Sequence, residues 1–377
     1  MKRLLVLNYE FPPLGGGGGV AAYNLAKGFI QNGYEVDYLT TGFKGLKKFE
    51  VVDGINVYRV PVIGRKGLQT ATMISLLSFP LAALWQGIML CRKYEYDFIN
   101  THFVVPTGPL GYLLSKLFKI KNILSLHGGD IYDPSKKSSP HRFFITHRVV
   151  RFLINNADVV VAQSSNTKAN AVEYYGITRP IEIIPLAYEP HSFTPVSKEG
   201  LGLDSNKKYI VGVGRMVARK DFSTFIKVIA ALDNTVHGII IGDGPERPML
   251  EKLAKTLNVT ERLHLVGQVS EEKKFQYLAV SDVFLLSSLH EGFGIVLQEA
   301  MQVGLPIVAT NNGGQVDLID DTKNGFLTNI GDIADITNKL NNLLAFEDKR
   351  KDIAKLNKFY ITKFNIKNIA TSHQLLV

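Results

Sequence analysis

Short apolar runs alternate with longer amphipathic segments along the whole chain, and they do so in two series. Short apolar runs are typical of buried strands, and the segments between them repeat their apolar positions with helical spacing. Strand–helix alternation predicts parallel sheets with helices on both faces. The expected strands are 4–7, 36–40, 98–101, 123–126 and 159–162, then 209–213, 238–241, 263–266, 283–287 and 307–309, with helical segments such as 20–31, 222–232 and 295–302 between them.

A polar stretch, residues 184–208, separates the two series. Proline occurs three times within it, and proline blocks regular structure and stiffens a linker. The length of 377 residues also suits two domains of ordinary size. We therefore predict an α/β fold of two Rossmann-like parallel-sheet domains, residues 1–190 and 191–360. Ligands of such sheets bind beyond the carboxyl ends of the strands, so we expect the two sheets to face a cleft.

Residues 71–91, "ATMISLLSFPLAALWQGIMLC", form an uncharged stretch between basic flanks. Its length is close to the roughly 20 residues that cross a bilayer, but Pro80 and several polar side chains interrupt it. We favour a core helix that is broken at the proline. The alternatives are a helix at an anionic membrane surface, anchored by Trp85 and by basic residues within 65–93, and a transmembrane helix.

Basic residues are concentrated in the first half of the chain. Of the 43 lysines and arginines, 21 fall in residues 1–190, against 13 of the 34 acidic residues, so this half carries nearly all of the net charge of +9. The excess favours an anionic partner, such as an acidic or phosphorylated acceptor or a membrane surface, although a solvated basic face fits equally well. No arginine-rich arm, zinc-ligand spacing or basic–aromatic pattern indicates nucleic acid.

A single cysteine, Cys91, excludes an intramolecular disulfide and suits a reducing cytoplasm. The first apolar run soon meets Pro12 and Pro13, so it predicts a buried strand rather than a signal peptide. We therefore expect a cytoplasmic protein, with the inner face of the membrane as an alternative location.

Five consecutive glycines, Gly15 to Gly19, follow the first expected strand and precede a helix. Glycine lets a ligand approach the backbone without meeting a Cβ, and a helix N-terminus offers N–H groups to a phosphate. The stretch is neither a P-loop nor a G-x-G-x-x-G fingerprint. We favour a loop that lines a ligand site, and a flexible turn is the alternative.

The stretch "GVGRMVARKDF", residues 212–222, places Arg215 just past a strand end and Lys220 before the next helix. A guanidinium binds phosphate oxygens in pairs, and an ammonium adds a mobile charge. Together they could hold a diphosphate and neutralise it as it leaves. A plain surface pair is the alternative.

His127 stands at the end of an expected strand, just before Gly128, Gly129 and Asp130. The glycines would let a ligand come close, and a neutral imidazole could contact a substrate hydroxyl. A structural histidine is the alternative. Asp130 is better explained as a helix cap or a loop brace than as a catalytic group.

The stretch "LHEGFGIVLQEA", residues 289–300, places Glu291 in a loop and Glu299 in the helix that follows. A glycosidase pair flanks one bond from opposite sides, roughly 5–9 Å apart, whereas two carboxylates on one loop–helix unit approach a ligand from one side. Hydroxyl binding is therefore favoured, with solvent-exposed glutamates as the alternative. The absence of Asp-x-Asp and of histidine ligand spacing predicts no metal.

Taken together, these motifs resemble the family-4 retaining glycosyltransferases of the two-domain GT-B fold. The resemblance rests on the proline–glycine N-terminal loop, "LHGGD", "GVGR" with Lys220, "IGDGPE", "LHLVGQVS", "LLSSLHEGFGIVLQEAMQVGLPIVAT" and "NNGG". It implies transfer of a hexose, with retention and without a metal or other cofactor, in polysaccharide or glycolipid synthesis. The donor would be a UDP- or GDP-sugar and the acceptor a glycan or a lipid-linked hydroxyl. The second domain would bind the nucleotide sugar and the first would lie on the acceptor side. The segment 361–377 would return to the first domain.

The resemblance also implies roles for the candidate residues. His127, Arg215, Lys220 and Glu291 would be the catalytic group, in which Arg215 and Lys220 hold the diphosphate and His127 and Glu291 touch the donor sugar. The remaining donor contacts would come from Gly18 and Gly19 near the diphosphate, Val266 at the base, Gly292, Phe293, Gly294 and Ile295 at the sugar, and Glu299 at the ribose hydroxyls.

Two other function classes remain open from the sequence. A nicotinamide-dependent oxidoreductase would need an intact G-x-G-x-x-G fingerprint, which the chain lacks. A nucleotide-sugar-binding or membrane-associated protein without turnover would need no catalytic group at all.

Overall fold

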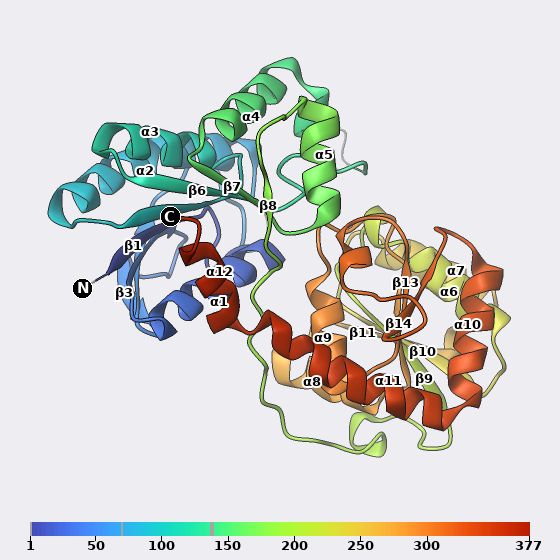
Figure 1. The fold of residues 1–377 in the computed structure, drawn as a ribbon. Coiled ribbons are helices and arrows are strands. Elements are labelled where there is room, and N and C mark those ends of the chain that lie inside the picture. Colours follow the sequence, from blue (N-terminus) through green and yellow to red (C-terminus); the bar gives the residue numbers. More distant parts are fainter. Residues whose placement is uncertain (1, 69–70, 136–138) are drawn as a thin grey trace. The chain divides into compact units, whose positions relative to one another are not determined.

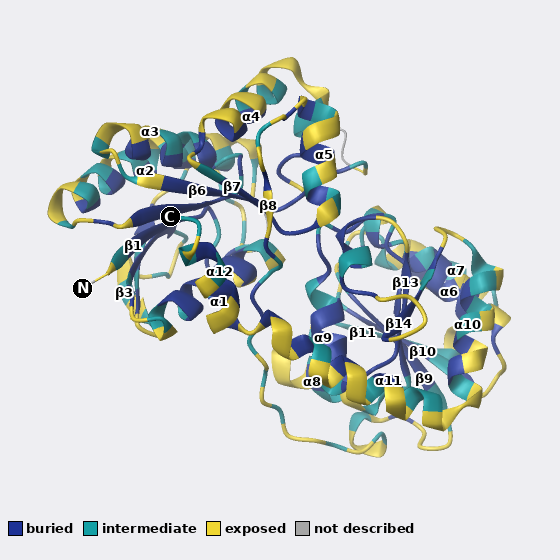
Figure 2. Ribbon diagram, viewed as in Figure 1, coloured by how far each residue is buried: buried dark blue, intermediate teal, exposed yellow. Residues whose placement is uncertain are grey.

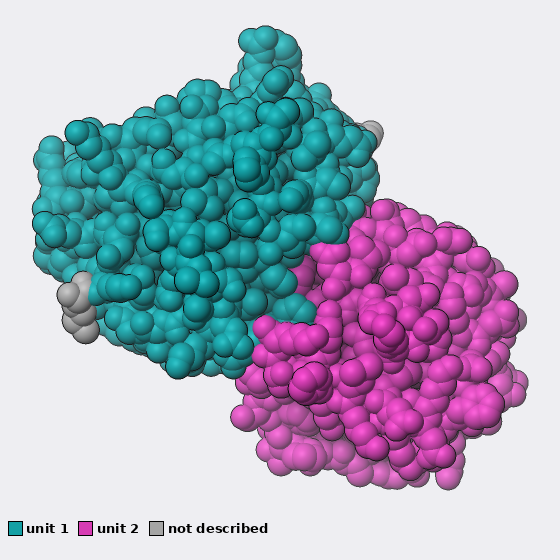
Figure 3. Space-filling view, viewed as in Figure 1, with its two compact units in different colours: residues 1–189, 364–377 teal, residues 190–363 magenta. Residues whose placement is uncertain are grey.

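The computed structural model describes residues 2–68, 71–135 and 139–377 and divides the chain into two compact units (Figures 1 and 3). Unit 1 comprises the residues up to 189 together with 364–377, and unit 2 comprises residues 190–363. Segments from both ends of the sequence therefore build unit 1.

The sheet of unit 1 has eight strands within the described residues, in the order β3-β4-β2-β1-β5-β6-β7-β8. Neighbouring strands are parallel, except for the antiparallel pair of β3 and β4 at one edge. The strands are β1 (Arg3–Leu7), β2 (Glu35–Thr41), β3 (Phe49–Val52), β4 (Ile55–Val60), β5 (Phe98–His102), β6 (Lys121–Leu126), β7 (Val159–Ala162) and β8 (Glu182–Ile183).

Helices cover both faces of this sheet (Figure 1). They are α1 (Gly17–Gln31), α2 (Met73–Lys93), α3 (Gly108–Phe118), α4 (Phe144–Asn156), α5 (Ser165–Tyr175) and α12 (Ile366–Gln374), with a short 3-10 helix η1 (Pro140–Arg142). Alternate side chains of a strand point to opposite faces. Leu4 and Val6 of β1 accordingly pack with α1 and α12, whereas Leu5 and Leu7 pack with α2 and α3.

The strand register shows which face α4 covers. Leu7 is aligned with Thr101, and Thr101 is aligned with Leu124. Leu124 belongs to the core that α4 covers, and side chains aligned across parallel strands share a face. α2, α3 and α4 therefore lie together on one face of the sheet, and α1 and α12 lie on the other.

The sheet of unit 2 has six parallel strands within the described residues, in the order β11-β10-β9-β12-β13-β14. The strands are β9 (Lys208–Val213), β10 (Val236–Ile241), β11 (Leu263–Gly267), β12 (Val283–Leu286), β13 (Ile307–Thr310) and β14 (Gly325–Thr328). The prediction of two α/β units with parallel sheets is confirmed.

The helices of unit 2 flank this sheet. One core, formed with α6, α7, α10 and α11, contains alternate side chains of the strands, and in it Phe225, Ile240 and Val308 are fully buried. The helices are α6 (Phe222–Ala231), α7 (Arg247–Thr256), α8 (Glu271–Val280), α9 (Ile295–Val303), α10 (Ile333–Ala345) and α11 (Glu347–Tyr360). Short 3-10 helices are η2 (Glu199–Leu201), η3 (Ala218–Lys220), η4 (Thr260–Arg262), η5 (Gly314–Asp317) and, ending at the first residue of unit 1's second segment, η6 (Ile361–Phe364).

α2 is one unbroken helix, Met73–Lys93, with Pro80 inside it. The expectation of a core helix broken at the proline is therefore wrong. A proline inside a helix costs about 3 kcal/mol, because it removes a backbone hydrogen bond and its ring clashes with the preceding turn. Packing offsets this cost, because Phe79, Ala83 and Leu90 are buried in the core of unit 1. The opposite stripe of α2 is exposed (Figure 2).

Candidate functional site

A polar cluster in unit 2 joins Glu291 to two cations of one short turn. Glu291 Oε1 accepts a hydrogen bond from Lys220 Nζ at 2.6 Å, and Oε2 accepts one from Arg219 Nη1 at 2.8 Å. Glu291 and Lys220 are buried, and Arg219 is half-buried. Arg219 also donates to the carbonyl of His290 at 2.7 Å. Both carboxylate oxygens are thus fixed by charge-assisted hydrogen bonds.

The surrounding charges determine what the Glu291 carboxylate can do. Burial disfavours its charged form, but the charges of Lys220 and Arg219 and their hydrogen bonds outweigh burial and lower the pKa of Glu291 to about 2. At neutral pH this group has no proton to donate and is a weak base. It can still accept a hydrogen bond from a ligand hydroxyl. The cluster therefore suits positioning of a ligand rather than acid–base chemistry.

Local backbone geometry brings Lys220 to Glu291. Lys220 ends η3, and Asp221 follows it with φ of 43° as the N-cap of α6. A Cβ on Gly214 would lie 2.8 Å from Lys220 Cε, so glycine at this position leaves the space that the lysine side chain occupies. Ser287 Oγ donates to the Lys220 carbonyl at 3.0 Å and ties the turn to the end of β12.

The Gly-Gly turn after β13 supports the loop that carries Glu291. Gly313 has φ of 110° and forms an isolated parallel bridge with Glu291, and Gly314 N donates to the Glu291 carbonyl at 2.7 Å. A Cβ on Gly313 would lie 2.5 Å from that carbonyl oxygen. The two loops can therefore approach so closely only because position 313 is glycine.

The N-terminus of α9 follows this loop directly. Gly294 is the N-cap, with φ of 106°, and Ile295 is the first helical residue. Glycine has no side chain with which to cap the first N–H groups of a helix, so this end suits a ligand oxygen. Phe293 is buried and anchors the loop, while Gly292 is half-buried.

Glu299 lies farther along α9 and has a different environment. Its Oε1 accepts a hydrogen bond from Lys274 of α8 at 2.8 Å. Its Oε2 is buried and has no hydrogen-bond partner in the part of the chain that the structure describes. Burial raises the pKa of Glu299, although the charge of Lys274 opposes this shift. A buried oxygen without a partner is costly, and here it is available to a ligand hydroxyl.

Arg215 and Val266 lie near the carboxyl ends of their strands. Arg215 comes two residues after β9 ends and is exposed, and Val266 lies within β11 and is half-buried. The sequence analysis coupled Arg215 with Lys220. Arg219 shares Glu291 with Lys220, and no sequence pattern selected it.

In unit 1, His127 lies at the carboxyl end of β6 in a group of buried rings. His102 Nδ1 and His127 Nε2 are 2.9 Å apart, and Phe103 stacks on His127 with ring centroids 4.3 Å apart. Burial lowers the pKa of His127 to about 3. Both imidazoles are therefore neutral at physiological pH, since burial also lowers the pKa of His102, and one ring donates to the other.

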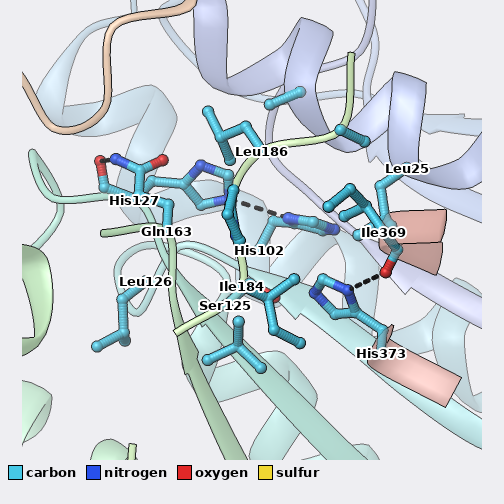
Figure 4. Close-up of a pocket in the computed structure, with 14 residues that line it drawn as sticks. Leu25, His102, Ser125, Leu126, His127, Gln163, Ile184, Leu186, Ile369 and His373 are labelled. Atoms are coloured by element: carbon cyan, nitrogen blue, oxygen red, sulfur yellow. Dashed lines mark hydrogen bonds between the residues drawn. The ribbon is translucent and has the colours of Figure 1, made fainter. Parts of the chain in front are cut away.

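A cavity of about 20 Å³ lies beside these rings (Figure 4). His102, His127 and His373 line it, together with Gln163, whose side-chain amide donates to the His127 carbonyl at 2.7 Å. His373 belongs to α12, and its Nδ1 is 3.0 Å from the Ile369 carbonyl. The cavity has room for about one water molecule, so it is too small for a sugar.

The glycine-rich loop reaches the same rings. α1 begins within it, at Gly17. A Cβ on Gly18 would lie 2.3 Å from Phe103 Cζ, so Gly18 packs against the ring that stacks on His127. The fold thus brings together the glycine-rich loop and the His127 loop, which are far apart in the sequence.

Glu10 occupies part of the anion-binding end of α1. Its Oε2 accepts hydrogen bonds from Gly16 N at 3.1 Å and from Gly19 N at 3.2 Å. A carboxylate of the chain itself is favourable at a helix N-terminus. Two of the N–H groups that we expected to be open to a phosphate are therefore already engaged.

Asp130 is a brace for the His127 loop. Its Oδ1 accepts a hydrogen bond from His127 N at 3.0 Å, and its Oδ2 accepts one from Val104 N at 2.7 Å. Burial raises the pKa of Asp130 to about 6, against the opposing effect of these backbone donors. The expectation of a bracing role is confirmed.

Several residues in these clusters had no clear sequence signal. Arg219 stands in the quoted "GVGRMVARKDF" stretch, so a search for every cation in that turn would have found it. No motif or spacing connects Lys274 with Glu299, Glu10 with the glycine loop, or His102 with His127. In the described part of the chain, no group of three or more His, Cys, Asp or Glu side chains is arranged to hold a metal ion.

Two family descriptions match nearly the whole chain. Residues 15–191 match "Glycosyltransferase Family 4", and residues 194–358 match "Glycosyl transferases group 1". The chain belongs to the group 1 glycosyltransferases. A glycosyltransferase is a transferase, so the chain is an enzyme of that class, and an oxidoreductase is no longer a candidate.

Individual glycosyltransferases resemble the chain over most of their length. An N-acetyl-alpha-D-glucosaminyl L-malate synthase of Bacillus anthracis is 26% identical over 90% of this chain and 88% of its own. The solved sucrose-phosphate synthase of Thermosynechococcus elongatus has a TM-score of 0.86 at 22% identity, covering 100% of this chain and 98% of that chain. HepE of Anabaena, solved with UDP-glucose, has a TM-score of 0.75 at 20% identity, covering 100% and 99%. These likenesses confirm the GT-B fold.

Proposed function

We propose that this glycosyltransferase moves a hexose from a UDP- or GDP-sugar to a hydroxyl of a glycan or lipid-linked acceptor, with retention and without a metal. The observation that carries the proposal is Glu291, held between Lys220 and Arg219 and followed at once by the glycine N-cap of α9. Further support comes from the relatives, since HepE of Anabaena was solved with UDP-glucose.

The donor fits the distribution of charges in unit 2. An ammonium has three donors, so Lys220 can hold Glu291 and a phosphate oxygen at the same time. Exposed Arg215 adds a second cation, and the N–H groups that begin α9 add further donors. Oε2 of Glu299 is the acceptor for the ribose hydroxyls in this proposal.

The proposed transfer breaks the bond between the sugar C1 and the diphosphate oxygen. The acceptor oxygen forms its bond to C1 on the same face, and its proton passes to the departing phosphate oxygen. Cations at the diphosphate stabilise the negative charge that develops there. No protein group needs to carry the proton, which agrees with a Glu291 pKa of about 2 and a His127 pKa of about 3.

A donor panel tests this assignment. We expect either UDP-hexoses or GDP-hexoses to raise the melting temperature, because a ligand at a hundredfold excess over its Kd stabilises by about 2.7 kcal/mol. Lys220→Ala should abolish the increase, and Lys227→Ala, at an exposed site on α6, should preserve it. Glu299→Gln should reduce the increase without unpairing Glu291.

Turnover is measured separately, as release of UDP or GDP when an acceptor mixture is added. Release above the rate of donor hydrolysis would support a transferase, and donor binding without release would indicate a binding protein without turnover. The donor assignment fails if no nucleotide sugar changes the melting temperature, or if Lys220→Ala leaves the increase intact.

A further inference from the structure

α2 carries an exposed apolar stripe on a helix that is otherwise docked on the sheet. A helix that is apolar on all sides is normally buried on all sides. Here Leu77, Leu81 and Trp85 are 71%, 78% and 68% exposed. They lie on the side of α2 opposite the side chains that pack into the core of unit 1. Their spacing of four residues places them in one row along the outer side of the helix.

Exposed apolar side chains continue onto α3 and α4, which lie on the same face of the sheet as α2. α2 and α3 approach closely, because a Cβ on Gly87 would lie 2.6 Å from the Leu114 side chain. Tyr112 of α3 and Phe152 of α4 form an edge-to-face pair with centroids 5.1 Å apart. We call this the three-helix surface: Ile74, Leu77, Leu81 and Trp85 of α2, Leu113 and Leu117 of α3, and Phe144, Ile145 and Phe152 of α4, all exposed.

The segment of the chain that carries the three-helix surface is rich in basic residues. Within residues 65–152, the described residues include ten lysines and arginines against four acidic residues, and two of those four, Asp130 and Asp133, are buried. The cations lie next to the apolar groups, since Arg148 sits over the Phe144 ring at 4.3 Å. At the C-terminal end of α2, Arg92 and Lys93 are exposed.

We propose that the three-helix surface binds the anionic interface of a lipid bilayer, with its apolar side chains among the acyl chains and its cations at the headgroups. Helices that lie at an interface combine these features, an apolar row and flanking lysine, arginine and tryptophan. The proposal is independent of the donor site in unit 2, and it places unit 1 at the surface where a lipid-linked hydroxyl would lie.

A helix that crosses the bilayer fits the structure less well. α2 is long and apolar enough to span by length and composition. Crossing would remove Phe79, Ala83 and Leu90 from the core that they share with Leu5 and Leu7 of the central strand. Lying on the surface leaves this core intact.

A second copy of the chain is also a less favourable occupant. A symmetric contact through this surface would bring the same basic residues of both copies together, and like charges across an interface oppose association. Anionic headgroups instead neutralise them. The charge around the apolar row therefore selects lipid over self-association.

Trp85 supplies a direct readout, because it is the single tryptophan of the chain. We expect its emission to shift to shorter wavelength with vesicles of phosphatidylglycerol and phosphatidylcholine, and to be quenched by lipids brominated in the acyl chain. Phosphatidylcholine vesicles alone should give little change. Raising the salt to about 1 M, where the Debye length is about 3 Å, should reduce binding but leave the bound spectrum the same.

Variants test which residues carry the binding. Leu77→Ser with Leu81→Ser should reduce partitioning into anionic vesicles by roughly tenfold or more, with an unchanged melting temperature because both positions are exposed. The matched control is Phe346→Ser with Phe359→Ser, two exposed phenylalanines of unit 2, which should bind as the wild type does.

Other outcomes would overturn the proposal. An unchanged Trp85 spectrum with anionic vesicles excludes insertion of this surface. A concentration-dependent blue shift without vesicles, together with a dimer in sedimentation equilibrium, would assign the surface to a second copy. Retention in the membrane after alkaline carbonate washing would indicate a spanning helix. Donor binding should be the same in the double variant and the wild type, so a failure here is distinct from a failure of the donor assignment.

Discussion

Glu291 and Glu299 are eight positions apart, yet their surroundings push their ionisation in opposite directions. Glu291 has a cation on each oxygen, and its pKa falls to about 2. Glu299 has one lysine and one oxygen without a partner among the described residues, and burial raises its pKa. The first is a fixed anion that organises the loop around it. The second retains an oxygen for a ligand.

Glu291→Gln should destabilise unit 2 most above pH 4.5. The pKa of Glu291 falls from 4.5 to about 2 on folding, so its stabilisation is complete above 4.5 and is lost as the pH falls toward 2. The variant also leaves Lys220 and Arg219 without their counter-charge, at a cost of about 3 kcal/mol near neutral pH. Urea unfolding of the wild type and of Glu291→Gln should give free energies of unfolding whose difference becomes smaller as the pH falls.

Glu261→Gln, at an exposed site on η4, is the control for this pH series. Its free energy of unfolding should stay close to that of the wild type at every pH. If the difference in the free energy of unfolding between the wild type and Glu291→Gln is constant from about pH 7 to about pH 3.5, the two cations do not determine the ionisation of Glu291.

Glu299→Gln should weaken nucleotide binding about tenfold, because an amide in place of the carboxylate removes a charged acceptor worth roughly 1.5–3 kcal/mol. Lys274 has a second partner, Glu271, at 2.7 Å, and Glu271 is exposed. Glu271→Gln therefore removes the other carboxylate from the same lysine and should leave the affinity nearly unchanged. Calorimetric titration with UDP and GDP measures both, and equal losses would assign the effect to Lys274 alone.

At the residue scale, the sequence indicated the site residues that belong to a recognisable motif. It did not indicate those that reach the site from a distant part of the chain. Lys220, Glu291 and the glycines around them share two short stretches, so their type and spacing were informative. Which arginine turns toward Glu291 depends on the backbone of η3 and could not be predicted. Lys274 reaches Glu299 only because α8 and α9 pack together.

At the scale of elements, α1 and α12 meet through a glycine. A Cβ on Gly28 would lie 2.2 Å from the Ile366 carbonyl oxygen and 2.9 Å from Ala370 Cβ. The close approach also lets Asn32 donate hydrogen bonds to the Lys367 carbonyl and to Thr371. The attachment of α12 therefore depends on the absence of a side chain at position 28.

Gly28→Ala should destabilise unit 1 by about 1–3 kcal/mol, because the added methyl group meets backbone that cannot move aside. In an ordinary helix the same exchange stabilises, since alanine is the better helix former by about 1 kcal/mol. Gln31→Ala, at an exposed site of α1, serves as the control for helix propensity. Thermal unfolding shows whether Gly28→Ala stabilises or destabilises the protein. A melting temperature above that of the wild type would contradict the packing argument.

Element types followed from the sequence where the apolar pattern was strong. The central strands were predicted because both of their faces are buried, which leaves continuous apolar runs. Four strands, β3, β4, β8 and β14, were not predicted. Burial alternates along β3 and along most of β4, and β8 and β14 have only two and four residues, so none of them gave a clear apolar run. α2 was misjudged because composition cannot show that tertiary packing compensates for a proline.

At the scale of the whole molecule, unit 1 is discontinuous in sequence and unit 2 is continuous. Ile366, Ile369 and Ala370 of α12 belong to the same core as Leu4 and Val6 of β1. The central sheet of unit 1 is therefore covered on one side partly by the last segment of the chain.

Ending the chain after Lys363 should destabilise unit 1 and leave unit 2 folded. The deletion exposes apolar side chains at the α1 face of the sheet, each worth about 1.5–3 kcal/mol when fully buried. Hydrogen exchange followed by mass spectrometry should show faster exchange in α1 and β1 and unchanged protection in β9 and β12. Equal protection of both units in the shortened protein would show that α12 contributes little to the core.

The split composition of unit 1 also sets an order of events during translation. Residues 2–189 emerge first but lack the helix that completes their core, and 174 residues of unit 2 must be made before it arrives. At about 5–20 residues per second this delay is roughly 10–35 s. Throughout that interval the nascent chain carries an uncovered apolar face next to α1, so this is the period in which a chaperone on the ribosome would matter most for its yield.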